Sequence, residues 1–334
     1  MPVLKRIALV PVLFAIALAA PAKAETEVEI GYMPILPVSQ LFVALEQGWL
    51  KKAGIKAKLV KFQNGPAMVQ AVLAGQLDVA HFGIGPAMVA RAKGADIKVV
   101  ASSIVEQISF IALKDLAPYF AKDPSTAFAR FRKDKGRQAV ITTFPVGSVP
   151  QTVLQYWLRK ELKANLGDVK IIYQGAAQVQ QALLTDAVDG AAILEPIVTN
   201  ITKRVPGATV VARGSAMFKG QPGAVLAVRE KLIRDKPKLV AALVRAHEDA
   251  TRMLNGDPET AATAVQRYVG GGRLPKAIVL TAIRSSKGNF VADPNKIVEG
   301  ARRMRDFQAE IKTLKAKVKI GDLFDTRFYD ALSK

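Results

Sequence analysis

The feature that most constrains the fold of this chain is a pattern that occurs twice, at residues 63–86 and 174–196. Each copy combines a turn, a short amphipathic helix, an acidic turn and a buried strand, and ends in a loop that contains proline. Asp78 of the first copy aligns with Asp189 of the second. Because strand, helix and strand in this order form half of a doubly wound α/β domain, the repeat predicts two similar lobes. Such sheets bind ligands beyond the carboxyl ends of their strands, so two lobes that face each other there would enclose a cleft.

The first 24 residues have the three regions of a secretory signal peptide. Lys5 and Arg6 form the basic region, residues 7–20 form the apolar region, and residues 22–24 read Ala-Lys-Ala, which is typical of a cleavage site. We expect cleavage after Ala24 and export to the periplasm. The chain has no cysteine. This excludes disulfides, thiolate metal sites and a lipoprotein anchor, so we expect a free periplasmic protein.

The chain is strongly basic, with 48 Lys and Arg against 28 Asp and Glu and a formal charge of +20. Cleavage would remove only three of these cations, Lys5, Arg6 and Lys23. The others are spread along the chain, and no recognition helix, zinc pattern or aromatic RNA-binding strand accompanies them. We therefore expect no nucleic-acid partner. The charge indicates either a solvated surface or a field that enriches anionic ligands.

Apolar strands and amphipathic helices alternate along the chain and divide it between the two lobes. We place residues 25–113 and 214–334 in lobe 1 and residues 114–213 in lobe 2. The chain then crosses twice, near residues 113–115 and 213–224, and two crossings allow a hinge. The expected strands include residues 27–31, 56–62, 97–103, 109–113, 139–143, 169–173 and 224–228, and the expected helices include 38–50 and 149–162.

A turn at residues 144–150 joins a buried strand to a helix. After Phe144, Gly147 permits a tight turn, Ser148 is a natural N-cap, and Pro150 is tolerated in the first helical turn. Such a start leaves N–H groups of Ser148 and Val149 facing the cleft. The turn is therefore either an anion site or a plain capped helix.

The first lobe has two comparable turns. Gly83, Ile84 and Gly85 follow a buried strand, and the two glycines would let the backbone approach a ligand closely. The third glycine of a dinucleotide fingerprint is missing, so no nucleotide cofactor is expected. Gln63 and Asn64 begin the other turn, and their amide side chains could reach the cleft.

Few residues could carry catalysis or bind a metal. The two histidines, His81 and His247, have no credible metal spacing, and no nucleophile elbow is present. His81 is expected in the core or at a ligand, and His247 in solvent. Glu195 follows a strand and would either accept hydrogen bonds from a ligand or favour a helix N-terminus by its charge. We expect no enzyme activity, no catalytic residues, no metal and no cofactor.

Several short motifs, taken in order, resemble the periplasmic substrate-binding proteins of the aliphatic sulfonate, taurine and nitrate ABC importers. The resemblance rests on residues 30–32, 62–68, 75–79, 83–87, 147–148 and 193–196. It implies a two-lobed, type II periplasmic-binding-protein-like α/β fold that closes about a hinge on one ligand. The ligand contacts it implies are Tyr32, Ser39, Gln40, Gly83, Ile84, Gly85, Gln107, Gly147, Ser148, Val149 and Glu195.

The resemblance also implies a monomeric receptor that delivers a small, anionic organic ligand to an inner-membrane ABC permease. An alkanesulfonate or taurine is the first expectation. A thiamine-precursor pyrimidine, an aromatic carboxylate, nitrate or bicarbonate are the alternatives, because Leu194 stands where sulfonate binders tend to carry tryptophan. Two other classes with this fold are disfavoured. A pyrimidine synthase would need a cysteine-rich motif, and a LysR-type regulator would need an N-terminal winged helix.

Overall fold

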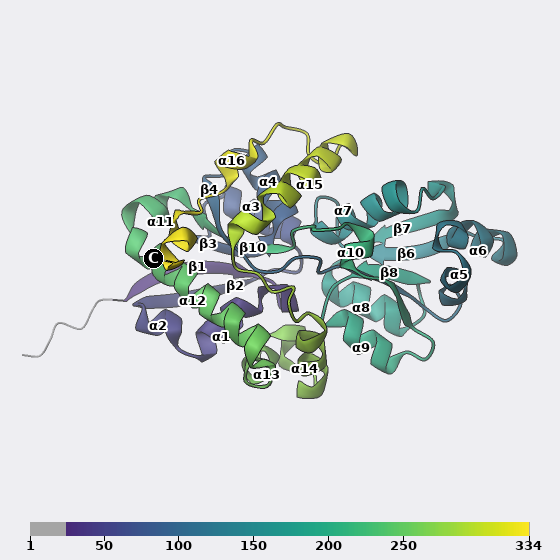
Figure 1. Cartoon of the computed structure of the whole chain (residues 1–334), viewed down its shortest axis with the longest axis horizontal. Coiled ribbons are helices and arrows are strands. Elements are labelled where there is room, and N and C mark those ends of the chain that lie inside the picture. The colour runs from purple at the N-terminus through teal and green to yellow at the C-terminus, as the bar shows by residue number, and fades with distance from the viewer. Residues whose placement is uncertain (1–24, 334) are drawn as a thin grey trace, which may run out of the picture.

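Two five-stranded sheets form the centres of two lobes that lie side by side in a computed structural model, which describes residues 25–333 (Figure 1). Lobe 1 denotes here the part built on the first sheet, and lobe 2 the part built on the second. The first sheet contains β1 (Thr26–Tyr32), β2 (Ile55–Lys61), β3 (Val79–Gly83), β4 (Ile97–Ser102) and β10 (Ala224–Arg229). The second contains β5 (Ser109–Ala112), β6 (Ala139–Thr143), β7 (Val169–Tyr173), β8 (Gly190–Ile193) and β9 (Thr209–Ala212).

The two sheets have the same topology. Their strand orders are β2-β1-β3-β10-β4 and β7-β6-β8-β5-β9. In both, the first three strands are parallel, and the fourth position is held by an antiparallel strand. These antiparallel strands are β5 and β10, and each begins just after the chain crosses from one lobe to the other. β5 follows the first crossing, and β10 follows the second. The predicted two-lobed α/β fold is confirmed.

Helices cover the sheets (Figure 1). In lobe 1, α12 packs on α1, while α15 contacts both α4 of lobe 1 and α7 of lobe 2. The helix expected at residues 38–50 is interrupted at Gly48, whose φ of 68° separates α1 from α2. The helices are α1 (Ser39–Glu46), α2 (Trp49–Lys52), α3 (Gly65–Leu73), α4 (Ile84–Ala92), α5 (Ala117–Lys122), α6 (Ala127–Lys135), α7 (Val149–Tyr156), α8 (Ala176–Leu184), α9 (Ile197–Arg204), α10 (Gly214–Met217), α11 (Glu230–Asp235), α12 (Pro237–Gly256), α13 (Pro258–Gln266), α14 (Lys276–Ser285), α15 (Val298–Glu310), α16 (Ile320–Leu323) and α17 (Arg327–Asp330).

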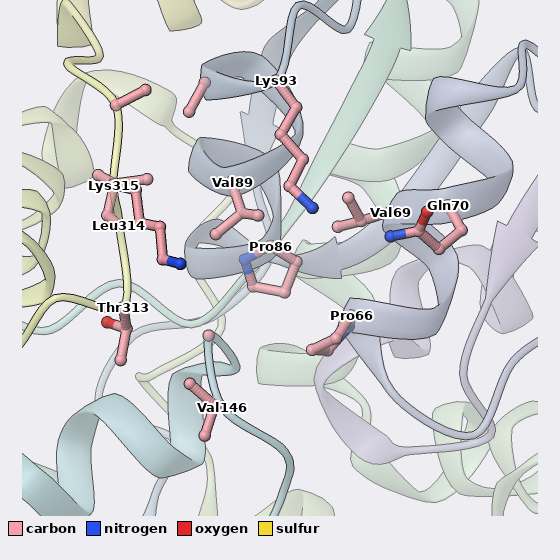
Figure 2. Close-up of a pocket in the computed structure, with 13 residues that line it drawn as sticks. Pro66, Val69, Gln70, Pro86, Val89, Lys93, Val146, Thr313, Leu314 and Lys315 are labelled. Atoms are coloured by element: carbon pink, nitrogen blue, oxygen red, sulfur yellow. The ribbon is translucent and has the colours of Figure 1, made fainter.

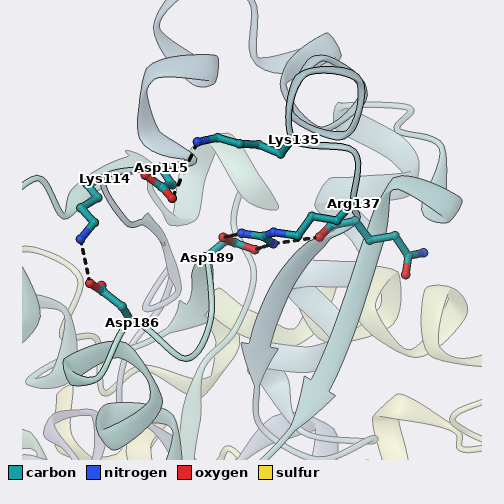
Figure 3. Close-up of polar contacts among 7 residues, drawn as sticks. Lys114, Asp115, Lys135, Arg137, Asp186 and Asp189 are labelled. Atoms are coloured by element: carbon teal, nitrogen blue, oxygen red, sulfur yellow. Dashed lines mark hydrogen bonds and ion pairs between the residues drawn. The ribbon is translucent and has the colours of Figure 1, made fainter.

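The aligned aspartates of the repeat, Asp78 and Asp189, accept equivalent backbone hydrogen bonds in the two lobes. The Oδ2 of Asp78 accepts a hydrogen bond from the N–H of Glu29 at 3.0 Å, and the Oδ2 of Asp189 accepts one from the N–H of Val140 at 2.7 Å. Each aspartate therefore ties the start of a central strand to the neighbouring parallel strand. Asp189 also receives two hydrogen bonds from the guanidinium of Arg137, at 2.6 and 2.7 Å (Figure 3). The acidic turn shared by the two copies therefore stabilises strand pairing within each sheet.

The first boundary between the lobes differs from the prediction. β5 was expected in lobe 1, but it pairs with β8 and β9 of the second sheet. The chain therefore crosses at residues 103–108, before β5. The return crossing at residues 213–223 runs beside it, since the N–H of Glu106 donates to Gln221 O and the N–H of Gly223 donates to Ile104 O, both at 2.9 Å. The boundary was misplaced because a short, fully buried strand shows no preference for either sheet.

The predicted signal peptide, residues 1–24, lies outside the described residues. Within residues 25–333, none of the helices combines the length and apolarity that a membrane crossing requires.

Candidate functional site

A small cavity lies between the lobes, where strands of both sheets end. Its volume is about 20 Å³. Met33 and Ile35 follow β1, Gly83 ends β3, and Phe144 and Leu194 follow β6 and β8 of the other sheet. This is the edge at which open α/β sheets bind ligands. The complete lining is Met33, Ile35, Gly65, Gly83, Pro86, Gln107, Phe144, Ser148, Val149, Pro150, Leu194 and Ala224.

Five of the predicted ligand contacts line this cavity: Gly83, Gln107, Phe144, Ser148 and Val149. Gln107 comes from the first crossing between the lobes and is 9 % exposed. Its Oε1 has no hydrogen-bond partner among the described residues. A buried amide oxygen without a partner is costly, and because it is an acceptor it would be satisfied by an N–H or O–H donor.

The turn before α7 has the predicted geometry. Gly147 has a φ of 86°, in the region that favours glycine, and the Oγ of Ser148 accepts a hydrogen bond from the N–H of Gln151 at 3.4 Å. The N–H of Gly147 is taken by the side chain of Gln151 at 3.1 Å, and that of Ser148 by Pro145 O at 3.1 Å. The N–H of Ser148 is therefore not free, and only that of Val149 remains open to a ligand in the first helical turn.

Three helices start at the cavity with a proline in their first turn. These are Pro66 in α3, Pro86 in α4 and Pro150 in α7. Proline lacks an N–H, so each of these helix starts offers one donor fewer to an anion. In addition, no charged side chain lines the cavity within the described part of the chain. The cavity is therefore mainly apolar, with backbone donors and the Gln107 amide as its polar groups.

The lobes meet closely around the cavity at glycines. A Cβ on Gly83 would lie 2.8 Å from Cγ2 of Val149, and a Cβ on Gly85 would lie 2.9 Å from Gly147 O. In both cases the obstructing atom belongs to lobe 2. These two positions in lobe 1 therefore require glycine for the observed approach of the lobes.

The other predicted contacts lie outside the cavity lining. Ser39 and Gln40 are fully buried in lobe 1, where the Oγ of Ser39 donates to Leu36 O at 2.6 Å and the Nε2 of Gln40 donates to Ser103 O at 2.7 Å. Tyr32 packs its ring edge-on against Phe42, with 5.7 Å between ring centres. Gln63 is exposed, Asn64 caps α3 by accepting from the N–H of Ala67 at 2.9 Å, and Ile84, Gly85 and Gly147 stand next to lining residues.

Glu195 uses its carboxylate within the protein. Its Oε2 accepts from the N–H of Thr199 at 2.9 Å, and its Oε1 accepts from the hydroxyls of Thr199 and Ser285, each at 2.9 Å. Burial raises the pKa of Glu195, although the bonds from Thr199 and Ser285 act in the opposite direction. Because Ser285 belongs to α14 of lobe 1, Glu195 links the two lobes where they meet.

The prediction of a solvated His247 is wrong. The imidazole is 3 % exposed, and its Nε2 lies 2.6 Å from Ser102 O. It stacks on His81, which is 3 % exposed in the core, with 5.9 Å between ring centres. Burial lowers the pKa of His247 to about 4 and that of His81 well below its usual value. Among residues 25–333, no three acidic or histidine side chains are grouped to hold a metal.

Sequence reasoning missed most of the apolar lining. Met33 and Ile35 follow the first strand, so the rule for strand ends could have located them. Ala224 had no such signal, because it begins an antiparallel strand whose neighbours are set by the topology.

Solved structures share this arrangement. The nitrate-binding protein of Synechocystis has a TM-score of 0.78 at 15 % identity, covering 93 % of this chain and 89 % of that one. The alkanesulfonate-binding protein of Xanthomonas axonopodis, bound to MOPS, has a TM-score of 0.73 at 18 % identity, covering 91 % of this chain and all of that one. At these identities the likeness shows the fold.

Sequence comparison adds the family. A Bacillus subtilis protein named for aliphatic sulfonate binding is 26 % identical over 306 residues, covering 90 % of this chain and 86 % of its own length. A Brucella abortus protein named as a binding protein is 26 % identical over 252 residues, covering 73 % and 71 %. The model of the NMT1-like family matches residues 21–269. With its two matching sheets and its cavity between them, the chain belongs to the NMT1-like family and has the fold of two-lobed periplasmic binding proteins.

Proposed function

We propose that this protein is the solute-binding component of an ABC importer and holds one small ligand between its two lobes. The observation that carries the proposal is the cavity at the strand ends of both sheets, which has walls from both lobes. A clamp of this kind binds by rigid-body closure, and the two adjacent crossings are the natural hinge. Two rigid bodies would move in this closure. Lobe 1 comprises residues 25–102 and 224–333, and lobe 2 comprises residues 109–212.

For the ligand we propose a small organic anion of the alkanesulfonate or taurine type, which the lobes admit by separating from the approach described, because the cavity of about 20 Å³ has room for about one water molecule. The relatives named for sulfonate binding support it, as does the start of α7, where a free N–H and the helix dipole favour negative charge. Nitrate or bicarbonate is the second candidate. It is favoured by the small volume of the cavity and by similarity to the Synechocystis nitrate-binding protein.

The proposed contacts are Gly83, Gln107, Phe144, Ser148 and Val149, which line the cavity, with Gly85 and Gly147 beside it. We place the protein in the periplasm as a monomer that delivers unaltered ligand to a membrane permease. In this account the protein is a receptor and performs no catalysis.

A thermal-shift screen of the purified mature chain tests the proposal. The panel contains ethanesulfonate, taurine, nitrate, bicarbonate, a pyrimidine and an aromatic carboxylate. At 100 times its Kd, a ligand adds about 2.7 kcal/mol to the free energy of unfolding, which is readily detected. Stabilisation by one compound that is lost in Gln107→Leu and Val149→Asp supports the proposal. A compound that stabilises the parent chain and both variants equally would bind outside the cavity, and this result would contradict the proposal.

A further inference from the structure

A larger pocket opens beside the interlobe cavity. Its volume is about 370 Å³, against about 20 Å³ for the cavity between the lobes. Its walls come from the outer faces of α3 and α4, from the turn before α7 and from the segment 313–316 that follows α15. The turn belongs to lobe 2, and the other walls belong to lobe 1. A volume of this size lies in the range of small-molecule sites.

The walls of this pocket are largely apolar. Val69 of α3, Pro86 and Val89 of α4, and Leu314 form much of the surface, and Val146 completes it from lobe 2 (Figure 2). Val146 is 49 % exposed, and it is one of two large hydrophobic side chains that are exposed in the described chain. Val146 therefore extends the apolar wall of the pocket to the surface of lobe 2.

Two lysines supply the charge. Figure 2 shows Lys93, the residue that follows α4, extending toward Val69, and Lys315 extending toward Pro86. Both are exposed, and neither has a carboxylate partner among residues 25–333. No acidic side chain lines the pocket. The local field therefore favours an anion, while the walls favour an apolar body.

We propose that this pocket, which adjoins the small cavity between the lobes and shares Pro86 with it, is a second binding site, for a small amphipathic organic anion. The apolar body rests on Val69, Val89 and Val146, and the anionic group lies between the ammonium groups of Lys93 and Lys315. A body of six to eight carbons fits this pocket and does not fit the cavity between the lobes. Binding of such an anion here does not require a ligand in the small cavity, because Lys93, Lys315 and the apolar walls lie outside it.

Octanoate is the probe, measured by calorimetry on the mature chain. The affinity should rise about threefold to fourfold for each methylene from butanoate to octanoate, the gain expected for burying each group. The uncharged analogue 1-octanol should bind more weakly than octanoate. An affinity that does not depend on chain length would overturn the proposal, as would the absence of octanoate binding at millimolar concentration.

Matched variants locate the site. Lys93→Gln with Lys315→Gln should weaken octanoate binding about tenfold, whereas Lys51→Gln with Lys52→Gln, which removes the same charge from α2, should not. Val146→Asp should weaken binding at least tenfold, whereas Tyr173→Asp, at the other exposed large hydrophobic residue, should not. All six substituted positions are exposed, so the fold should tolerate the changes.

Two results would overturn the assignment. Equal losses in both lysine pairs would mean that octanoate responds only to net charge. A loss in Gln107→Leu but not in the Lys93 and Lys315 pair would place octanoate between the lobes.

Discussion

Gly85→Ala is predicted to weaken ligand binding without weakening the fold. The new Cβ would lie 2.9 Å from Gly147 O of lobe 2 and 3.0 Å from Nε2 of Gln308. An ordinary carbon–oxygen contact is at least about 3.3 Å, so the lobes must separate by about 0.4 Å. The Nε2 of Gln308 is buried and donates to the hydroxyl of Thr152 in lobe 2 at 3.0 Å, so turning it away would break that bond, and the carbonyl of Gly147 can move only with its loop. Over-packing of this kind costs about 1–3 kcal/mol, and it arises only when the lobes are closed.

The expected result is a ligand affinity about 5- to 150-fold lower, since 1.4 kcal/mol is a factor of ten. The free energy of unfolding should be unchanged or slightly higher, because alanine favours a helix over glycine by up to about 1 kcal/mol. Affinity is measured by calorimetry with the compound found in the thermal-shift screen, and stability by urea unfolding. Gly256→Ala is the control, because a Cβ there meets nothing within 4 Å. If Gly85→Ala binds as tightly as the parent, the lobes do not close on the ligand as described.

Three further variants or conditions have defined outcomes. Ser148→Ala should lower the free energy of unfolding by about 1 kcal/mol through loss of the α7 cap and also weaken ligand binding in calorimetry; unaltered affinity would reduce the turn to a plain cap. Ser285→Ala removes a hydrogen bond to the buried carboxylate of Glu195 across the lobes, so ligand affinity should fall about tenfold, whereas Thr281→Ala in the same helix should leave it unchanged. Burial lowers the pKa values of His81 and His247 in the folded protein, so as the pH falls these histidines are protonated in the unfolded chain before they are protonated in the folded one. The free energy of unfolding should therefore be highest above pH 6.5. Between pH 6.5 and pH 4 it should fall by up to about 1.4 kcal/mol per pH unit for each histidine. Urea unfolding between pH 7.5 and 5 checks this, and a His247→Gln variant with the same slope as the parent would refute a contribution from His247.

The repeat predicted the fold because its signals are local. Each copy carries its own helix, turn and buried strand, and the aspartates Asp78 and Asp189 mark the same turn in both. The cap at Ser148 and the turn at Gly147 were likewise predictable, since both depend on the conformational preferences of single residues.

Features set by distant packing could not be predicted in the same way. β5 reads as a buried strand in either lobe, and only its pairing with β8 and β9 assigns it to lobe 2. Glu195 resembles a ligand contact until Ser285, 90 residues further along the chain, is found beside it. Without the contacts between the lobes, the sequence cannot separate a residue that joins the lobes from one that binds the ligand.

His247 is a different case, because its burial could have been inferred. Its neighbours Arg245, Glu248 and Asp249 suggested solvent exposure. However, Val240, Val244, His247, Thr251 and Leu254 follow helical spacing and form the buried face of α12. The helical period was a better guide than the adjacent charges.

Small-angle X-ray scattering of the mature chain, with and without its ligand, tests whether the two lobes close on one small molecule at the strand ends of both sheets. The radius of gyration should fall when the compound from the thermal-shift screen saturates the parent protein, and it should fall less in Gly85→Ala. An unchanged radius in the parent, with binding confirmed by calorimetry, would mean that the lobes do not close on the ligand.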